Sequence, residues 1–184
     1  MSAKTYLIPQ ALRRFARDRR GVSAVEFALL APLMIGLYLG CAEISDGVAA
    51  DRKVSLIAAT LSNLTSQVST ITTAEMTNIL DASTAIVSPY AASKLKMSVT
   101  CLKIDANGQA TVKWSVTRNG TAKSGVMSIP TALAVPNSQL IYAETSYDYT
   151  PTIGYTITGT LTLSDHMYMA PRITAPTYGA TACT

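Results

Sequence analysis

The chain of 184 residues has the length of one domain, or of one membrane anchor followed by a modest folded part. Its residues are 48% hydrophobic and only 14% charged, whereas about 25% of residues in soluble proteins are charged. Residues 1–20 carry a charge of +5 within a total of +4, which leaves −1 for the rest of the chain. Because the positive charge is one terminal block rather than a stripe, a nucleic-acid-binding protein is disfavoured.

The least polar stretch of the sequence is residues 22–41, which contain one ionisable carboxylate, Glu26. Twenty helical residues span the ~30 Å hydrocarbon core of a bilayer. Strong positive charge precedes this run and nearly balanced charge follows it. The positive-inside rule therefore predicts a transmembrane helix with a cytoplasmic N-terminus and with residues 42–184 exported.

Four interpretations of the first forty residues remain open at this point. A secretory signal peptide has an apolar centre of about 7–15 residues, which is shorter than this run. A lipoprotein signal would make Cys41 the lipidated residue, although Tyr38 stands where a Leu is expected. A twin-arginine signal would use one of the two Arg-Arg pairs, but neither is followed by the expected pattern. The fourth interpretation is an anchor that is cut on its cytoplasmic side and stays in the membrane.

Glu26 favours the fourth interpretation. A carboxylate in a membrane helix costs up to roughly 3 kcal/mol near the bilayer centre, and so it needs a partner. Cleavage between Gly21 and Val22 would give Val22 a free amine with a reference pKa of about 7.7–8, four residues from Glu26 on the same helical face. The simpler alternative is a carboxylate that lies in the headgroup layer and hydrogen-bonds to water.

These residues form a recognisable pattern. The sequence RRGVSAVEF, in which Glu26 and Phe27 are fifth and sixth after Gly21, resembles a class III prepilin-like processing site. The run continues as ALLAPLMIGLYLGCAEI, with Pro32 inside it and Glu43 just beyond its apolar part. As a whole, residues 19–45 resemble the N-terminal module of TadE/TadG-like pseudopilins of the tight-adherence (Flp-type) pilus system.

The resemblance implies a bacterial inner-membrane protein that crosses the membrane once and has a periplasmic C-terminal domain. A prepilin peptidase would remove residues 1–21 by cutting between Gly21 and Val22. Other pilin or pseudopilin subunits, the pilus assembly platform and the lipid bilayer would be its partners. Its function would be the assembly of an adhesive fibre. No nucleic acid and no cofactor is implied.

The exported helical region is expected over residues 42–90. Apolar residues recur there at spacings of three and four, the pattern of a stripe along one helix face; they are Val54, Ile57, Leu61, Leu64, Val68 and Ile71. The stripe would pack either on the protein's own C-terminal domain or on another subunit. A second helix is predicted by the capping-box pattern Thr72-x-x-Glu75.

The β domain is expected over residues 91–184, because the apolar pattern changes to alternation from Leu95 onward. We predict an antiparallel meander of three strands joined by Asn-Gly turns, and then two more strands. The five segments are residues 95–104, 109–118, 121–129, 140–150 and 155–163. Val112, Trp114 and Val116 would share one face, with Trp114 as a core anchor. The predicted fold is therefore α+β and pilin-like, with a long N-terminal helix packed on a small antiparallel sheet.

The three cysteines predict one disulfide. Cys101 and Cys183 both lie in the part assigned to the oxidising periplasm, whereas Cys41 lies at the edge of the bilayer. The tail after Pro171 has little apolar surface of its own. We therefore expect a Cys101–Cys183 bond that pins this tail to the first strand of the sheet.

The sequence shows no catalytic or metal-binding constellation. His166 is the single histidine, and Ser164 and Asp165 beside it would point to different sides of an extended segment. We expect no metal site and no enzymatic activity. The leading hypothesis is a pseudopilin that acts in pilus assembly, and the alternative is a membrane-anchored or lipidated periplasmic binding protein that joins no fibre.

Overall fold

The computed structural model describes residues 20–152 and 159–184. The helices are α2 (Arg20–Ser66) and α3 (Thr73–Ala85), and the short 3-10 helices are η1 (Ala92–Lys94) and η2 (Thr131–Leu133). The strands are β1 (Thr70–Ile71), β2 (Leu95–Ile104), β3 (Ala110–Arg118), β4 (Val126–Met127), β5 (Gln139–Tyr149), β6 (Leu161–Met169) and β7 (Thr177–Tyr178). The chain divides into two compact units, residues 1–42 and 43–184. The expected leader, apart from its last two residues, lies outside the described residues.

The first unit contains the N-terminal part of α2. Its large apolar side chains face outward, and Phe27, Leu29 and Tyr38 are each more than 70% exposed. Pro32 lies inside the helix, where it removes one backbone donor. Among the described residues, α2 is the one helix that is long and apolar enough to cross a membrane. An exposed apolar surface of this kind is what a lipid-facing helix requires.

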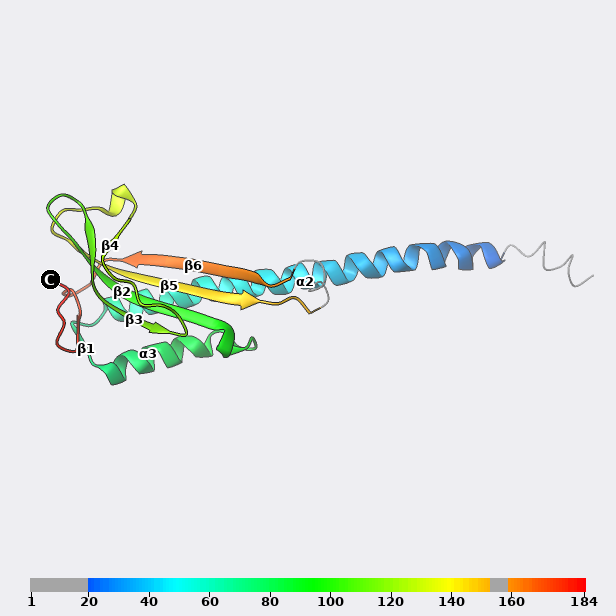
Figure 1. Ribbon diagram of the computed structural model, residues 1–184. Coiled ribbons are helices and arrows are strands. Elements are labelled where there is room, and N and C mark those ends of the chain that lie inside the picture. Colours follow the sequence, from blue (N-terminus) through cyan, green and yellow to red (C-terminus); the bar gives the residue numbers. More distant parts are fainter. Residues whose placement is uncertain (1–19, 153–158) are drawn as a thin grey trace, which may run out of the picture. The chain divides into compact units, whose positions relative to one another are not determined.

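The second unit is a five-stranded antiparallel sheet with helices on one face (Figure 1). The strand order is β4-β3-β2-β5-β6. The C-terminal part of α2 and helix α3 bury apolar side chains in one core together with β2, β3 and β5. The predicted α+β fold, with a long helix packed on an antiparallel sheet, is therefore confirmed.

The predicted apolar stripe of α2 faces this sheet. Val54, Ile57 and Leu61 have no exposed surface and belong to the main core. The helix ends at Ser66, so the last two members of the predicted stripe, Val68 and Ile71, lie beyond it, and Ile71 is in β1. The sequence left open whether this stripe packs on the protein's own domain or on another subunit. In the structure, it packs on the protein's own sheet.

Helix α3 begins with the predicted capping box. The backbone N–H of Glu75 donates to Thr72 Oγ1 at 3.2 Å, and the N–H of Thr72 donates to Glu75 Oε2 at 2.8 Å. These two bonds satisfy backbone donors that the first turn of a helix leaves without partners. The hydrogen bond from the Thr72 backbone also lowers the pKa of the Glu75 carboxyl. Met76 and Leu80 then bury the inner face of α3.

Two of the predicted strands have different bounds in the structure. The segment expected at 121–129 is extended as a strand only at β4, just after Gly125, whose φ is +75°. The strand expected at 155–163 is β6, which begins at Leu161, just after Gly159 with φ +68°. Residues 153–158 lie outside the described residues. The predicted meander of the first three strands is confirmed, because β2, β3 and β4 are neighbours in that order, and β5 pairs with the other edge of β2.

A β-bulge in β3 separates two apolar clusters. Cys101 pairs with Trp114, whereas the next residue, Leu102, pairs with Val112, which leaves Lys113 without a partner on β2. Trp114 therefore joins the main core below the helices, whereas Val112 joins a second cluster with Leu102. The prediction that Val112, Trp114 and Val116 share one face was wrong, because the bulge shifts the alternation by one residue.

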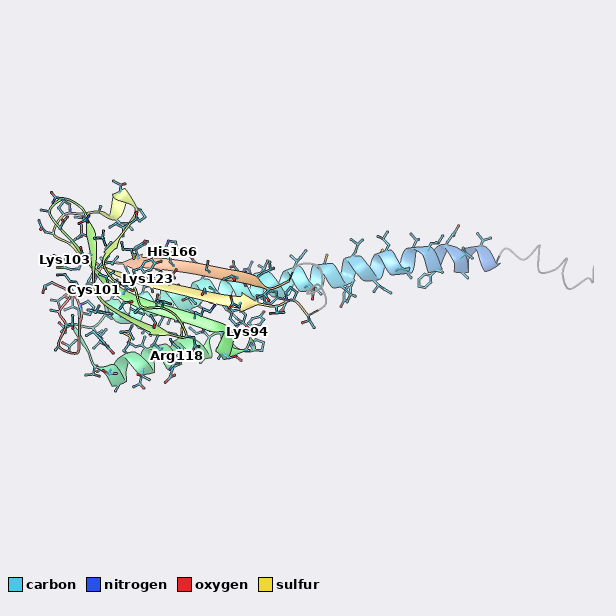
Figure 2. All side chains as sticks on the ribbon, in the orientation of Figure 1. Lys94, Cys101, Lys103, Arg118, Lys123 and His166 are labelled. Atoms are coloured by element: carbon cyan, nitrogen blue, oxygen red, sulfur yellow. A yellow bond between two sulfur atoms is a disulfide. The ribbon has the colours of Figure 1, made fainter. Side chains whose placement is uncertain are left out.

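A disulfide joins Cys101 in β2 to Cys183 in the C-terminal tail (Figure 2). Both residues are fully buried, and their Cα atoms are 6.0 Å apart. The tail is also held where β7 pairs in parallel with β1 and where Trp114 Nε1 donates to the carbonyl of Pro176 at 3.0 Å. The bond thus links the pair of cysteines expected from the sequence and ties the tail to the core.

Candidate functional site

The residues of the expected processing site all lie in the first turns of α2. Gly21, Val22, Glu26 and Phe27 are exposed and helical. Val22 and Glu26 are four positions apart in this helix, so they lie on the same face one turn apart. A Cβ atom added at Gly21 would meet nothing within 4 Å. The arrangement is compatible with a Val22 amine that approaches the Glu26 carboxylate.

The two other family-matching residues lie farther along α2. Pro32 is inside the apolar part of the helix, and Glu43 is the first residue of the second unit. Glu43 is partly buried, and its charge is one of the influences that raise the pKa of Tyr149. Its position therefore marks where α2 passes from the apolar run to the folded domain.

Asp46 and nearby tyrosines form a cluster that the sequence did not predict. This cluster joins α2 to the sheet. Asp46 in α2 accepts hydrogen bonds from Tyr90 and from Tyr149 in β5. The Tyr90 hydroxyl lies 2.8 Å from Asp46 Oδ1, and the Tyr149 hydroxyl lies 3.0 Å from Asp46 Oδ2. Burial and then the Asp46 carboxylate raise the pKa of both tyrosines to about 12. The two phenols therefore stay protonated donors across physiological pH.

The cluster fixes α2 to the domain next to its apolar run. The rings of Tyr90 and Tyr149 meet edge to face, with centroids 6.4 Å apart, and Tyr90 also contacts Tyr147 at 6.0 Å. A Cβ at Gly47 would lie 3.6 Å from the Tyr149 ring, an ordinary van der Waals distance, so helix and strand lie next to each other here. The sequence offered one signal for this cluster, its density of tyrosines after residue 140, but nothing that singled out Asp46.

The described residues contain no group of three or more His, Cys, Asp and Glu that could hold a metal ion. His166 lies in β6 and contacts the rings of Tyr142 and Tyr168. Asp165 accepts a hydrogen bond from the backbone N–H of His166 at 2.7 Å, so this carboxylate is not directed at the imidazole as in a catalytic triad.

An apolar helix able to cross a membrane, continued by an α+β domain packed on its second half, defines the architectural class of this chain. The family described as "TadE-like protein" matches residues 21–59. This segment contains the expected processing site, the apolar run and the first part of the buried stripe, and the match confirms the predicted resemblance there. No curated protein and no solved structure matches the chain significantly.

The family match and the apolar helix together support a membrane protein associated with a tight-adherence pilus. TadE-like proteins are pilus components rather than a family of enzymes. The match covers about a fifth of the chain and none of the sheet, so the C-terminal domain has to be interpreted from its own structure.

Proposed function

We propose that this protein is a pseudopilin of a tight-adherence pilus, held in the bacterial inner membrane by residues 22–41. Its N-terminus lies in the cytoplasm and its α+β domain in the periplasm. The observation that carries the proposal is the TadE-like match over residues 21–59, on a helix whose apolar side chains are exposed. A membrane or a neighbouring membrane helix is needed to cover such a surface.

Processing by a prepilin peptidase is part of this proposal. Glycine offers the peptidase a backbone without a side chain, and the positively charged leader keeps the bond after Gly21 on the cytoplasmic side. Cleavage there would create the Val22 amine, the cation that a membrane-embedded Glu26 lacks. Pairing of this amine with Glu26, in the same chain or in a neighbouring subunit, would lower the cost of placing the carboxylate in the bilayer.

The proposed role is structural. The buried stripe on α2 is occupied by the protein's own sheet, so it is not available for other subunits. The exposed side chains of residues 22–41 would instead contact lipid before assembly and other pilin or pseudopilin helices in the machinery. The assembly platform would act on the protein after its leader has been removed.

The test is the N-terminus of the protein extracted from the membrane, measured by intact mass. The proposal expects a chain that begins at Val22. A Gly21→Ala variant should still be cut because alanine is also small, whereas Gly21→Leu should keep the leader. A chain that begins at a lipid-modified Cys41 would instead support the lipidated binding protein. A chain that begins at residue 1 or 2 in a strain with an active prepilin peptidase would refute processing.

A further inference from the structure

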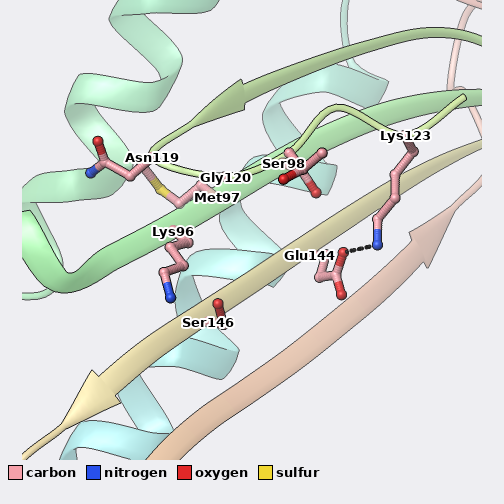
Figure 3. Close-up of a pocket in the computed structure, with 9 residues that line it drawn as sticks. Lys96, Met97, Ser98, Asn119, Gly120, Lys123, Glu144 and Ser146 are labelled. Atoms are coloured by element: carbon pink, nitrogen blue, oxygen red, sulfur yellow. Dashed lines mark ion pairs between the residues drawn. The ribbon is translucent and has the colours of Figure 1, made fainter.

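The five-stranded sheet has two edges, and the chain itself covers one of them. The segment after β3 folds back along that strand, where β4 pairs with the start of β3 and the N–H of Val112 donates to the carbonyl of Gly125 at 2.9 Å. Lys123 in this segment reaches Glu144 on β5, with Nζ 2.7 Å from Oε2 (Figure 3). The bulge at Lys113 also interrupts this edge. Bulges and covering segments prevent an edge strand from pairing with another chain.

The other edge of the sheet is β6, which is regular and exposed. It pairs with β5 residue by residue, without a bulge. Within the described residues, no further strand pairs with its open side. The strand contains no proline, lysine or arginine, and none of its nine residues is buried. An exposed edge of this kind is a template for another strand, so it needs some other means of staying unpaired.

The hydrogen bonds of the neighbouring strands show which backbone groups of β6 point to its open side. In an antiparallel ladder, opposite residues alternate between pairs that bond to each other and pairs whose N–H and C=O groups point away. The N–H of Ile104 at the end of β2 donates to the carbonyl of Ser138 just before β5 at 2.9 Å, so even-numbered residues bond β2 to β5. The odd-numbered residues of β5 therefore bond to β6, as Tyr147 does to Leu163. The residues of β6 whose backbone groups point to the open edge are then the even-numbered ones, Thr162, Ser164, His166 and Tyr168.

Asp165 lies at the centre of this edge. It is the middle residue of β6 and the one acidic residue in the strand. Its Oδ1 accepts a hydrogen bond from the backbone N–H of His166 at 2.7 Å. Because this N–H points to the open side, the carboxylate also lies at the edge. It therefore occupies a donor that an incoming strand would need.

Pairing with a second copy of this chain would bring Asp165 against itself. Two identical edge strands can pair antiparallel about a twofold axis. The register that overlaps the whole of β6 matches every outward-pointing backbone group, and it places Asp165 opposite the Asp165 of the second copy. Opposite residues that do not exchange backbone bonds have Cα atoms about 4.5 Å apart, so their side chains are close. Like charges in such a pair are destabilising.

We propose that Asp165 is a guard residue, which keeps the open edge of β6 from pairing with a second copy of this chain. Its charge opposes the one register that satisfies every outward-pointing backbone group, and its carboxylate occupies the central donor. A register shifted by two residues avoids the direct opposition but loses the backbone bonds of an end residue in each strand. The inference concerns the α+β domain alone, so it does not depend on processing, on the membrane anchor or on a role in a pilus.

The test measures the mass distribution of the full-length protein in detergent micelles over a concentration series, by analytical ultracentrifugation. Copies in separate micelles can meet in any orientation. Asp165→Asn removes the charge but keeps an amide oxygen for the N–H of His166. We expect its dissociation constant for self-association to be roughly tenfold lower than that of the wild-type protein. Asp81→Asn is the matched control, because it removes the same charge from an exposed position on α3. Its self-association should equal that of the wild type, and circular dichroism establishes that each variant is folded.

A charge swap tests the direct opposition of the two side chains. Asp165→Lys again places like charges opposite each other, so this variant alone should associate no more than the wild type. An equimolar mixture of the wild type and Asp165→Lys places opposite charges across the axis, so it should associate more than either protein alone.

The inference is overturned if Asp165→Asn associates no more than the wild type, or no more than Asp81→Asn. It is also overturned if the mixture associates no more than its two components, or if Asp165→Lys alone associates as strongly as Asp165→Asn. Each comparison is made between folded variants of the same chain, so association through the apolar helix contributes equally to all of them.

Discussion

Removing the disulfide should strongly destabilise the α+β domain. The two cysteines are 82 residues apart in sequence, and closing a loop of that length stabilises a fold by about 4.5 kcal/mol in the chain-entropy model. Typical domains have only about 5–15 kcal/mol of net stability. Replacing both Cys101 and Cys183 with alanine leaves neither partner of the disulfide as a new thiol, so the loss of stability is not confounded by new thiol chemistry.

The loss should be largest in the tail. In the wild-type protein, Arg172 is held by a hydrogen bond from its backbone N–H to the carbonyl of Ser66 at 2.9 Å and by one from Nη2 to Asn63 Oδ1 at 2.8 Å. Ile173 is already 70% exposed. Without the covalent bond, the tail depends on these contacts, the short β1–β7 pair and the Trp114 bond to Pro176. Trypsin should therefore cut after Arg172 faster in the double variant.

The assay measures the urea midpoint of unfolding and the rate of tryptic cleavage for the wild-type protein, the double variant and a Cys41→Ala control. The double variant should have a lower midpoint and faster cleavage, and the control should match the wild type. Maleimide labelling of the denatured wild-type protein should gain two thiols on reduction. An unchanged midpoint together with unchanged cleavage would refute the stabilising role, and no gain of thiols would refute the bond itself.

Three further predictions concern α2 and its contacts. Glu26→Gln should leave the N-terminal mass at Val22 but abolish assembled pili counted by electron microscopy, and wild-type pili would remove the reason for singling out this carboxylate. Leu61→Ala should cost about 2–5 kcal/mol in the free energy of unfolding because Leu61 is fully buried, whereas Leu56→Ala, at a 54% exposed position, should change it by no more than about 0.5 kcal/mol. The pKa values of Tyr90 and Tyr149 are about 12 in the folded protein and about 10 when unfolded, so their stabilising contribution is complete below pH ~10 and is lost as the pH rises toward 12. Denaturant titrations across this range should show that loss, and a free energy of unfolding that does not fall would contradict it.

The parts of the fold that the sequence predicted are those governed by neighbouring residues. The capping box of α3 needs only Thr72 and Glu75, which are three positions apart. Strand β2 covers the residues expected from alternation, and the buried stripe of α2 follows from helical spacing. In each of these elements, local geometry and burial favour the same conformation, so no distant contact was needed to recognise it.

The parts that the sequence did not predict depend on pairing between distant residues. The bulge at Lys113 appears only when β3 is set against β2, because alternation within β3 alone places Val112 and Trp114 on one face. The start of β6 is likewise set by its register, in which Leu161 pairs with Tyr149. The tyrosine cluster joins residues 44 and 103 positions apart, beyond the reach of any local pattern.

The two candidate sites differ in the same way. The expected processing site is a linear motif on one helix, so the order of residues from Gly21 to Phe27 is enough to recognise it. The cluster of Asp46, Tyr90 and Tyr149 instead combines α2, a loop and β5, and it can be found only in three dimensions. Short motifs therefore predict the expected processing site, but not the contacts that hold α2 to the sheet.

The family match also covers only the N-terminal part of the chain. The match ends at residue 59, inside α2, and leaves the whole sheet unmatched. The matched segment is an apolar helix with a short motif at its start, which sequence order alone is enough to recognise. A sheet whose inner face only has to cover the second half of α2 can vary its outer face without loss of the core. Residues on that outer face can therefore be substituted with little effect on the core that holds α2.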